Sequence, residues 1–169
     1  NEMVFLTEKI YANKENEIQR IFKDKVDKKK GNTAALTYLI SEEKSIIEAL
    51  KKADRTLINF NEKIKNIEHF SDNKNLWIQI IDKNGFSFYR SWTNKVGDNA
   101  AAARLDIAEM IKKPQEMSTI STGRFDMTFK TMLPIFDEED NFIGMIEMIS
   151  KFNSIANEFK KKKVEPLFI

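Results

Sequence analysis

From position 76 the chain runs Leu76-Trp77-Ile78-Gln79-Ile80-Ile81-Asp82-Lys83-Asn84-Gly85. Its first part is apolar and rich in isoleucine, which favours an extended strand. Asn84 and Gly85 can adopt the positive φ that a tight hairpin turn requires. Residues 86–93 follow as the partner strand, so we expect an antiparallel hairpin at this point of the chain.

The pattern after the hairpin predicts a short helix and then more strands. We expect the helix over residues 100–112, closed by Pro114. Residues 117–120 and 123–130 are expected to form one interrupted strand, residues 131–136 a second and residues 142–150 the last, with a turn over 137–141. Because such short links join antiparallel neighbours, the chain should contain an antiparallel sheet of about five strands.

Residues 1 to about 72 show the apolar spacing of amphipathic helices instead. A first helix should end at Lys28-Lys29-Lys30-Gly31, since basic residues followed by glycine are typical of a helix C-terminus. A second should begin at Asn32 or Thr33 and reach Leu50, with a break or restart at Ser41. A third should carry Leu57, Phe60, Ile64, Ile67 and Phe70.

These elements predict an α+β fold in which a long N-terminal helix covers one face of the sheet. We divide the chain into an N-terminal helical segment (1–75), a sheet core (76–151), and a C-terminal helix with the start of a following segment (152–169).

Composition excludes several classes of function. The chain has 28 Lys and Arg against 26 Asp and Glu, a net charge of +2, which argues against nucleic acid as a partner. There is no cysteine and only one histidine, so the chain has almost none of the side chains that a thiolate site, a catalytic triad or a zinc site requires. The acidic run at 137–140 lacks the pattern of a calcium loop. We therefore predict no metal and no cofactor.

No run approaches the roughly 18 apolar residues of a membrane helix, and the start Asn1-Glu2-Met3 has no signal-peptide pattern. We expect the chain to be a soluble piece of a longer protein. The basic run at 160–163 is expected to be a solvated helix end near a membrane surface.

Two motifs resemble the sensor domains of the PAS-like Cache family. The first is Ile80-Ile81-Asp82-Lys83-Asn84-Gly85, which is similar to the opening hairpin of such domains. The second is Met132-Leu133-Pro134-Ile135-Phe136-Asp137 followed by Asn141-Phe142-Ile143-Gly144-Met145-Ile146-Glu147, which resembles their closing pair of strands. The helical stretch from Thr33 to Leu50 resembles the helix that precedes the sheet, and the resemblance spans residues 2–155.

The resemblance implies an extracytoplasmic sensor on the periplasmic or extracellular side of the bacterial inner membrane. Such a domain is tethered in a chemoreceptor, histidine kinase or diguanylate cyclase and binds a small molecule. It is not itself an enzyme. It can form a homodimer through the N-terminal helix.

The first group of candidate ligand residues is Tyr89, Arg90 and Trp92. A guanidinium beside an indole suits a carboxylate, because arginine offers a bidentate fork and tryptophan an apolar wall. Arg90 and Trp92 match the Arg-x-Trp motif of amino-acid-binding Cache domains by spacing. On a strand they share one face and Tyr89 lies opposite. The alternative is an exposed arginine stacked on a half-buried tryptophan.

The second group lies on the strand after Gly123, where polar and apolar residues alternate. Its polar face carries Asp126, Thr128 and Lys130, which could line the pocket, with Asp126 accepting from a ligand amine. The simpler interpretation is a solvated face of an antiparallel sheet. Arg104 and Asp106 on the short helix could cover the same pocket or form a surface ion pair.

Small-molecule sensing is therefore our leading hypothesis, with an amino acid or small carboxylate as ligand. The alternative is a helical dimerisation or interaction module that binds no small ligand. A weaker third hypothesis is a hydrolase that uses Asp126 or Glu147.

Overall fold

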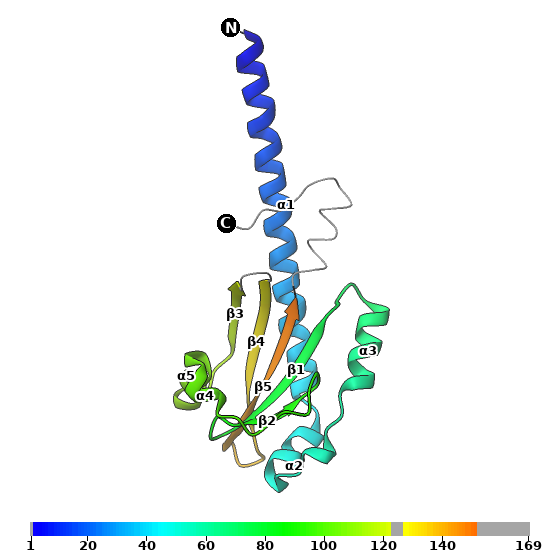
Figure 1. Cartoon of the computed structure of the whole chain (residues 1–169), viewed down its shortest axis with the longest axis vertical. Helices are drawn as coiled ribbons and strands as arrows, with labels where there is room; N and C mark the ends of the chain where they lie inside the picture. Colours follow the sequence, from blue (N-terminus) through cyan, green and yellow to red (C-terminus); the bar gives the residue numbers. More distant parts are fainter. Residues whose placement is uncertain (1, 123–126, 152–169) are drawn as a thin grey trace.

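The computed structural model describes residues 2–122 and 127–151 as a five-stranded sheet with helices on both faces (Figure 1). The helical elements are α1 (Glu2–Ser41), α2 (Lys44–Lys52), the 3-10 turn η1 (Arg55–Leu57), α3 (Asn61–Phe70), α4 (Ala100–Ala103) and α5 (Leu105–Lys112). The strands are β1 (Leu76–Asp82), β2 (Ser87–Arg90), β3 (Met117–Thr122), β4 (Met127–Phe136) and β5 (Phe142–Lys151). The predicted α+β class and antiparallel sheet are confirmed.

The strand order is β2-β1-β5-β4-β3, and every neighbouring pair is antiparallel. The last strand therefore lies in the middle, between β1 and β4. Apart from Glu147 and Ser150, the buried stretch of β5 is apolar, as expected for a central strand that is covered on both faces.

The two faces of the sheet are covered by different helices. Ile78 and Ile80 of β1 pack with Ile146 of β5 in the core beneath α1, α2 and α3. Ile81 packs on the opposite face, against Ile107 of α5. Side chains of β1 therefore alternate between an α1 face and an α4/α5 face, and these two names are kept below.

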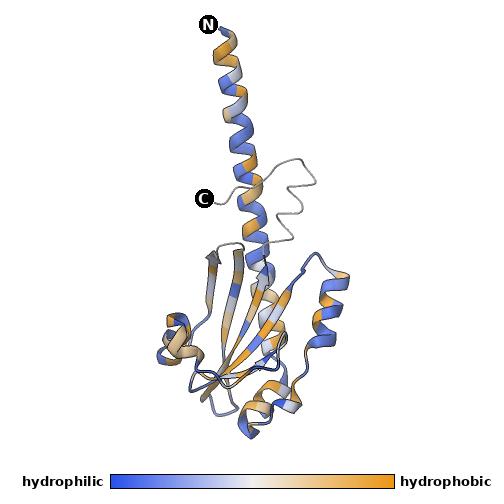
Figure 2. Cartoon of the chain, viewed as in Figure 1, coloured by the Kyte–Doolittle hydropathy of each residue, from blue (hydrophilic) through white to orange (hydrophobic). Residues whose placement is uncertain are grey.

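Helix α1 extends well past the sheet, and residues 2–20 are all exposed (Figure 1). Several large apolar side chains lie in this projecting part, among them Phe5, Ile10 and Tyr11. Figure 2 shows hydrophobic and hydrophilic bands following one another along the helix. In the described ranges, none of the helices combines the length and apolarity that a membrane span needs.

The prediction that a helix ends at Gly31 is wrong, because α1 continues through Gly31 to Ser41. A single glycine costs a helix about 1 kcal/mol. Burial of Thr33, Thr37 and Ile40 against the sheet offsets that cost. The predicted break at Ser41 is confirmed, since α2 begins at Lys44 after a short interruption. The third helix begins at Asn61, later than predicted, and so excludes Leu57 and Phe60.

The predicted division of residues 117–136 is also wrong. Residues 117–122 and 127–136 form two strands of a hairpin, β3 and β4, and not one interrupted strand followed by another. Strand β4 continues through Pro134. At this residue β4 has already passed the end of β3 and pairs only with β5, so a proline is tolerated. The expected helix over 100–112 is divided at Arg104 into α4 and α5, and β2 is shorter than predicted. The predicted tail helix, 152–163, and the segment to 169 lie outside the described residues.

The first hairpin turn forms where the sequence predicts, but only Gly85, and not Asn84, adopts positive φ. The Asp82 carboxylate accepts hydrogen bonds from the backbone N–H groups of Asn84 and Phe86, both at 2.9 Å. Gly85 has φ of 87°, and a Cβ at this position would lie 2.4 Å from the Cβ of Ala101. Glycine is thus required both for the turn and for the close approach of α4.

Candidate functional site

A row of polar side chains crosses the α4/α5 face at the centre of the sheet. Gln79 of β1 is paired with Arg90 of β2 on one side and with Glu147 of β5 on the other. Gln79 is 4% exposed and Glu147 is fully buried. Burying a carboxylate is costly unless the protein supplies a cation and hydrogen bonds. The row is therefore a feature that the fold maintains at an energetic cost.

The cation for Glu147 is Arg104, at the junction of α4 and α5. Its guanidinium donates to both Glu147 oxygens at 2.5 and 2.9 Å, and to both oxygens of Asp106 at 2.7 and 3.1 Å. Burial opposes the charge of Arg104, but hydrogen bonds to the two carboxylates raise its pKa above the usual value. Burial likewise opposes the charge of Asp106, yet Arg104 holds the pKa of Asp106 below its usual value. Arg104 and Asp106 are therefore both charged at neutral pH.

Next to this row lies a more accessible part of the same face. Trp77, Ile149, Lys130 and Thr119 follow one another across β1, β5, β4 and β3. Lys130 is half-buried, and its ammonium has no hydrogen bond or ion pair with any residue in the described ranges. Its positive charge is close enough to Asp106 to help lower the pKa of that carboxyl. Lys130 is thus a half-buried side chain that forms no ion pair with the described residues.

The last row of this face carries Thr128, which shares a hydrogen bond of 2.7 Å with Ser121 of β3. Its cross-strand neighbour on β5 is Lys151, whose ammonium lies 4.5 Å from the centre of the Trp77 ring. The indole of Trp77 also stacks on that of Trp92, with 5.1 Å between the rings. The aromatic pair forms a wall at the β1–β2 side of the face.

Arg90 stands beside that wall and already holds a carboxylate. Its two terminal nitrogens donate to the two oxygens of Asp98 at 2.8 Å each, and one also donates to the carbonyl of Lys95. These hydrogen bonds lower the pKa of Asp98. The guanidinium carbon lies 5.9 Å from the Trp92 ring. The Nε of Arg90 is buried and has no acceptor among the described residues, so one donor of Arg90 remains unused.

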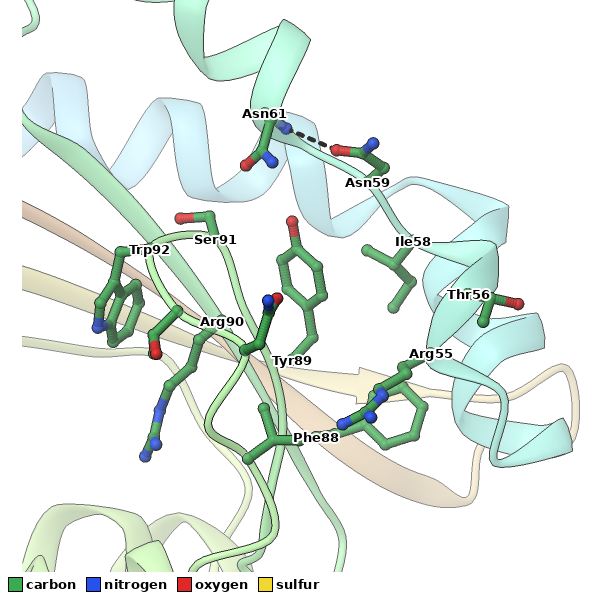
Figure 3. A pocket seen from close by; sticks show the side chains of 13 residues that line it. Arg55, Thr56, Ile58, Asn59, Asn61, Phe88, Tyr89, Arg90, Ser91 and Trp92 are labelled. Atoms are coloured by element: carbon green, nitrogen blue, oxygen red, sulfur yellow. Dashed lines mark hydrogen bonds between the residues drawn. The ribbon is translucent and has the colours of Figure 1, made fainter.

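Tyr89 faces the other way, as strand alternation predicts. Its hydroxyl accepts a hydrogen bond from the backbone N–H of Phe60 at 3.2 Å, and the two rings meet edge to face. Tyr89 also lines a cavity of about 560 Å³ between residues 55–61 and 88–96, beside the edge strand β2. We call this the edge cavity. Figure 3 shows Tyr89 rising toward Asn59 and Asn61, with the guanidinium of Arg90 turned away.

The structure thus places the predicted ligand residues in two environments. The α4/α5 face and its β2 rim carry Arg90, Trp92, Arg104, Asp106, Thr128 and Lys130. Tyr89 lies on the opposite side, in the edge cavity, which Arg90 and Trp92 also border. Asp126 lies outside the described residues.

Sequence reasoning did not assign a ligand role to Gln79, Trp77 or Asp98. Gln79 had a usable signal, because it interrupts an otherwise apolar strand, as does Glu147. Asp98 had none, since it lies in a polar loop. Over the described ranges, no three His, Asp or Glu side chains are grouped so as to hold a metal ion. The face offers cations, carboxylates and aromatic rings in fixed positions, which suits binding of a small charged molecule.

Comparison with known proteins identifies the family and the fold. Residues 11–164 match the model of the dCache_3 family, described as the double sensory domain of two-component sensor kinase. A search of curated protein sequences found no match.

Several solved structures share the fold. The sensor domain of Escherichia coli DcuS is 15% identical, with a TM-score of 0.57 over 78% of this chain and 97% of that one. A sensory box/GGDEF family protein domain from Vibrio parahaemolyticus is 11% identical, with a TM-score of 0.56 over 80% of this chain and 58% of that one. The sensor domain of the Vibrio cholerae histidine kinase DctB is 20% identical, with a TM-score of 0.52 over 75% of this chain and 50% of that one.

Proposed function

The chain belongs to the dCache_3 family of sensory domains, and on that premise we propose that its α4/α5 face binds a small carboxylate or an amino acid. As a member of this family the chain is an extracytoplasmic sensor domain of a signal-transduction receptor, on the periplasmic or extracellular side of the membrane. The ligand class and the residues that hold it are the part we propose.

The observation that carries the proposal is the state of Lys130. The Lys130 side chain is half-buried and forms no ion pair with any described residue, although it lies close enough to Asp106 to help lower the pKa of that carboxyl. A ligand carboxylate would supply the missing charge. The indoles of Trp77 and Trp92, beside the guanidinium of Arg90, offer an apolar wall.

Asp106 extends the proposal from carboxylates to amino acids. About 27% of its side chain is exposed, and Arg104 keeps it ionised. An ammonium group on the ligand could therefore bind Asp106 while the ligand carboxylate binds Lys130. Thr128, which shares the face, would add a hydroxyl donor or acceptor at its outer end.

Strand β4 offers a route from ligand to signal. Lys130 points to the α4/α5 face, while its neighbour Phe129 is 1% exposed and packs against Phe22 and Val26 of α1. A ligand that shifts β4 would change how the sheet packs on α1. Binding would then favour one of two pre-existing arrangements of sheet and helix.

The test is a thermal-shift screen with amino acids and small carboxylates, followed by calorimetry on each hit. A ligand at about 100 times its Kd should add roughly 2.7 kcal/mol of stability and raise Tm by several degrees. Lys130→Met should abolish the shift. Lys112→Met, which removes an exposed lysine from α5, should leave it unchanged. A hit that binds Lys130→Met as tightly as wild type would refute this placement.

A second candidate function is dimerisation without ligand binding. The exposed apolar side chains of the projecting α1, such as Phe5 at 65% and Tyr11 at 69%, favour it. Light scattering on wild type and on Phe5→Ser/Tyr11→Ser would test it, and a monomeric wild type would exclude it. Dimerisation together with an absence of hits in the screen would favour this second function over the first.

A further inference from the structure

The edge cavity borders the α4/α5 face at Arg90 and Trp92 but opens beside the outer edge of β2. It lies between the linker at 55–61 and the loop at 91–96, and Tyr89 enters it from the α1 side of the strand (Figure 3). Its volume of about 560 Å³ is within the range of small-molecule sites, roughly 300–1,000 Å³. It is therefore large enough to hold a ligand of its own.

The charge of the lining points to an anion. Two arginines and no carboxylate line the cavity. Arg90 is neutralised by Asp98 and directs its guanidinium away from Tyr89 (Figure 3). Arg55 has no ion pair or hydrogen bond through its side chain within the described part of the chain. One uncompensated guanidinium therefore remains, and this group binds carboxylates in a bidentate fashion.

Part of the remaining lining is apolar and comes from Ile58, Phe88, Trp92 and Val96, and the rest is polar but uncharged. Three asparagines, Asn59, Asn61 and Asn94, contribute to it, together with the hydroxyl-bearing Thr56 and Thr93. Asn59 accepts a hydrogen bond from the backbone of Asn61. The side-chain amides of Asn61 and Asn94 bind no protein group in the described ranges. An amide both donates and accepts, as does an alcohol, so this lining matches ligand hydroxyls better than an apolar ligand.

Tyr89 completes the site with an aromatic surface. Its oxygen accepts from the Phe60 backbone, and its own O–H is left to donate. The ring gives the aliphatic carbons of a ligand something to pack against.

We propose that the edge cavity is a second binding site, for a small polyhydroxylated carboxylate. Arg55 binds the carboxylate, Asn61 and Asn94 bind the hydroxyl groups, and Tyr89 packs against the carbon chain. This site does not depend on the function proposed for the α4/α5 face.

Three probes of matched length separate the parts of this proposal in calorimetry. Gluconate carries both the carboxylate and the hydroxyls, sorbitol only the hydroxyls, and hexanoate only the carboxylate. Gluconate should bind, and the other two should bind at least tenfold more weakly. Loss of a charge-assisted hydrogen-bond pair should make Arg55→Met about ten- to a hundredfold weaker for gluconate. Asn94→Leu should weaken gluconate severalfold and leave hexanoate unchanged.

The controls distinguish this site from the α4/α5 face. Arg20→Met removes an exposed arginine from α1 and should bind gluconate like wild type, and Lys130→Met should retain the gluconate binding that depends on Arg55. Amide chemical shifts of residues 55–61 and 89–94 should move on titration with gluconate. Three outcomes would overturn the proposal: no gluconate binding at millimolar concentration, equal binding of sorbitol, or loss of binding in Lys130→Met with retention in Arg55→Met.

Discussion

Replacing Arg104 by methionine should strongly destabilise the protein. The substitution keeps most of the side chain's apolar volume but removes the only cation that the described residues place on Glu147, a side chain with no exposed surface. Leaving one member of a buried ion pair without its partner costs about 3–5 kcal/mol. For a domain of this size the corresponding fall in Tm is roughly 10 °C.

Urea unfolding followed by tryptophan fluorescence measures this change directly. Arg90→Met is the matched control, because it is the same substitution at a guanidinium that also holds a carboxylate in a bidentate pair. Its partner Asp98 is 56% exposed and stays solvated when the arginine is lost. The expected cost of Arg90→Met is therefore about 1 kcal/mol.

The double variant Arg104→Met/Glu147→Met decides between two explanations of the loss. If an uncompensated buried carboxylate is the cause, removing it should recover most of the stability, since apolar replacements of buried ion pairs are often near neutral. A double variant as unstable as Arg104→Met would instead place the loss in side-chain packing. That result would refute the electrostatic reasoning.

Three further predictions concern the fold. Gly144→Ala should lower the free energy of unfolding, measured in urea, by about 2 kcal/mol or more, because the new Cβ would lie 2.6 Å from the carbonyl oxygen of Ile81. Gly31→Ala should raise it by about 1 kcal/mol, because Gly31 lies within a helix and a Cβ there would have no neighbouring atom within 4 Å outside the helix's own backbone. Phe129→Ala should cost about 3–5 kcal/mol and speed amide exchange in the part of α1 that packs on β4; unchanged exchange would contradict that contact. The pKa of Asp106 is lowered in the folded protein. Its contribution to the free energy of unfolding is therefore present above about pH 4, the pKa of an aspartate in the unfolded chain, and is lost as the pH falls further. The stability difference between wild type and Asp106→Asn should accordingly shrink in acid, and a constant difference from pH 7 to pH 3 would contradict it.

The turns and the two-face alternation could be predicted because local residues determine them. Asp82 and Gly85 produce the first hairpin turn through contacts within five residues. Asp137 does the same for the last turn, where it accepts from the backbone of Glu139 and Asn141. Neither depends on the rest of the fold.

The predicted helix boundaries were wrong where tertiary packing outweighed the local preference of the sequence. Gly31 and the lysines before it indicate a helix end, yet α1 continues because its next turns pack on the sheet. Lys29 belongs to that buried face and has its pKa lowered by burial, which Glu68 partly opposes. A basic run that looks like a solvated helix end is thus partly inside the protein.

The candidate site could be predicted only in part, because its central pairs come from strand order and not from sequence proximity. Arg90 and Trp92 are two positions apart, so the sequence alone places them side by side, and their ligand role stays a prediction. Glu147 meets Gln79 only because β5 is inserted between β1 and β4, and Arg104 reaches it only because the helix over 100–112 is divided at that residue. Polar residues that interrupt apolar strands were the one sequence signal for this cluster. In a five-stranded antiparallel sheet such interruptions are informative in pairs, because a buried polar group on one central strand requires a partner on a neighbouring strand or on the helix above it.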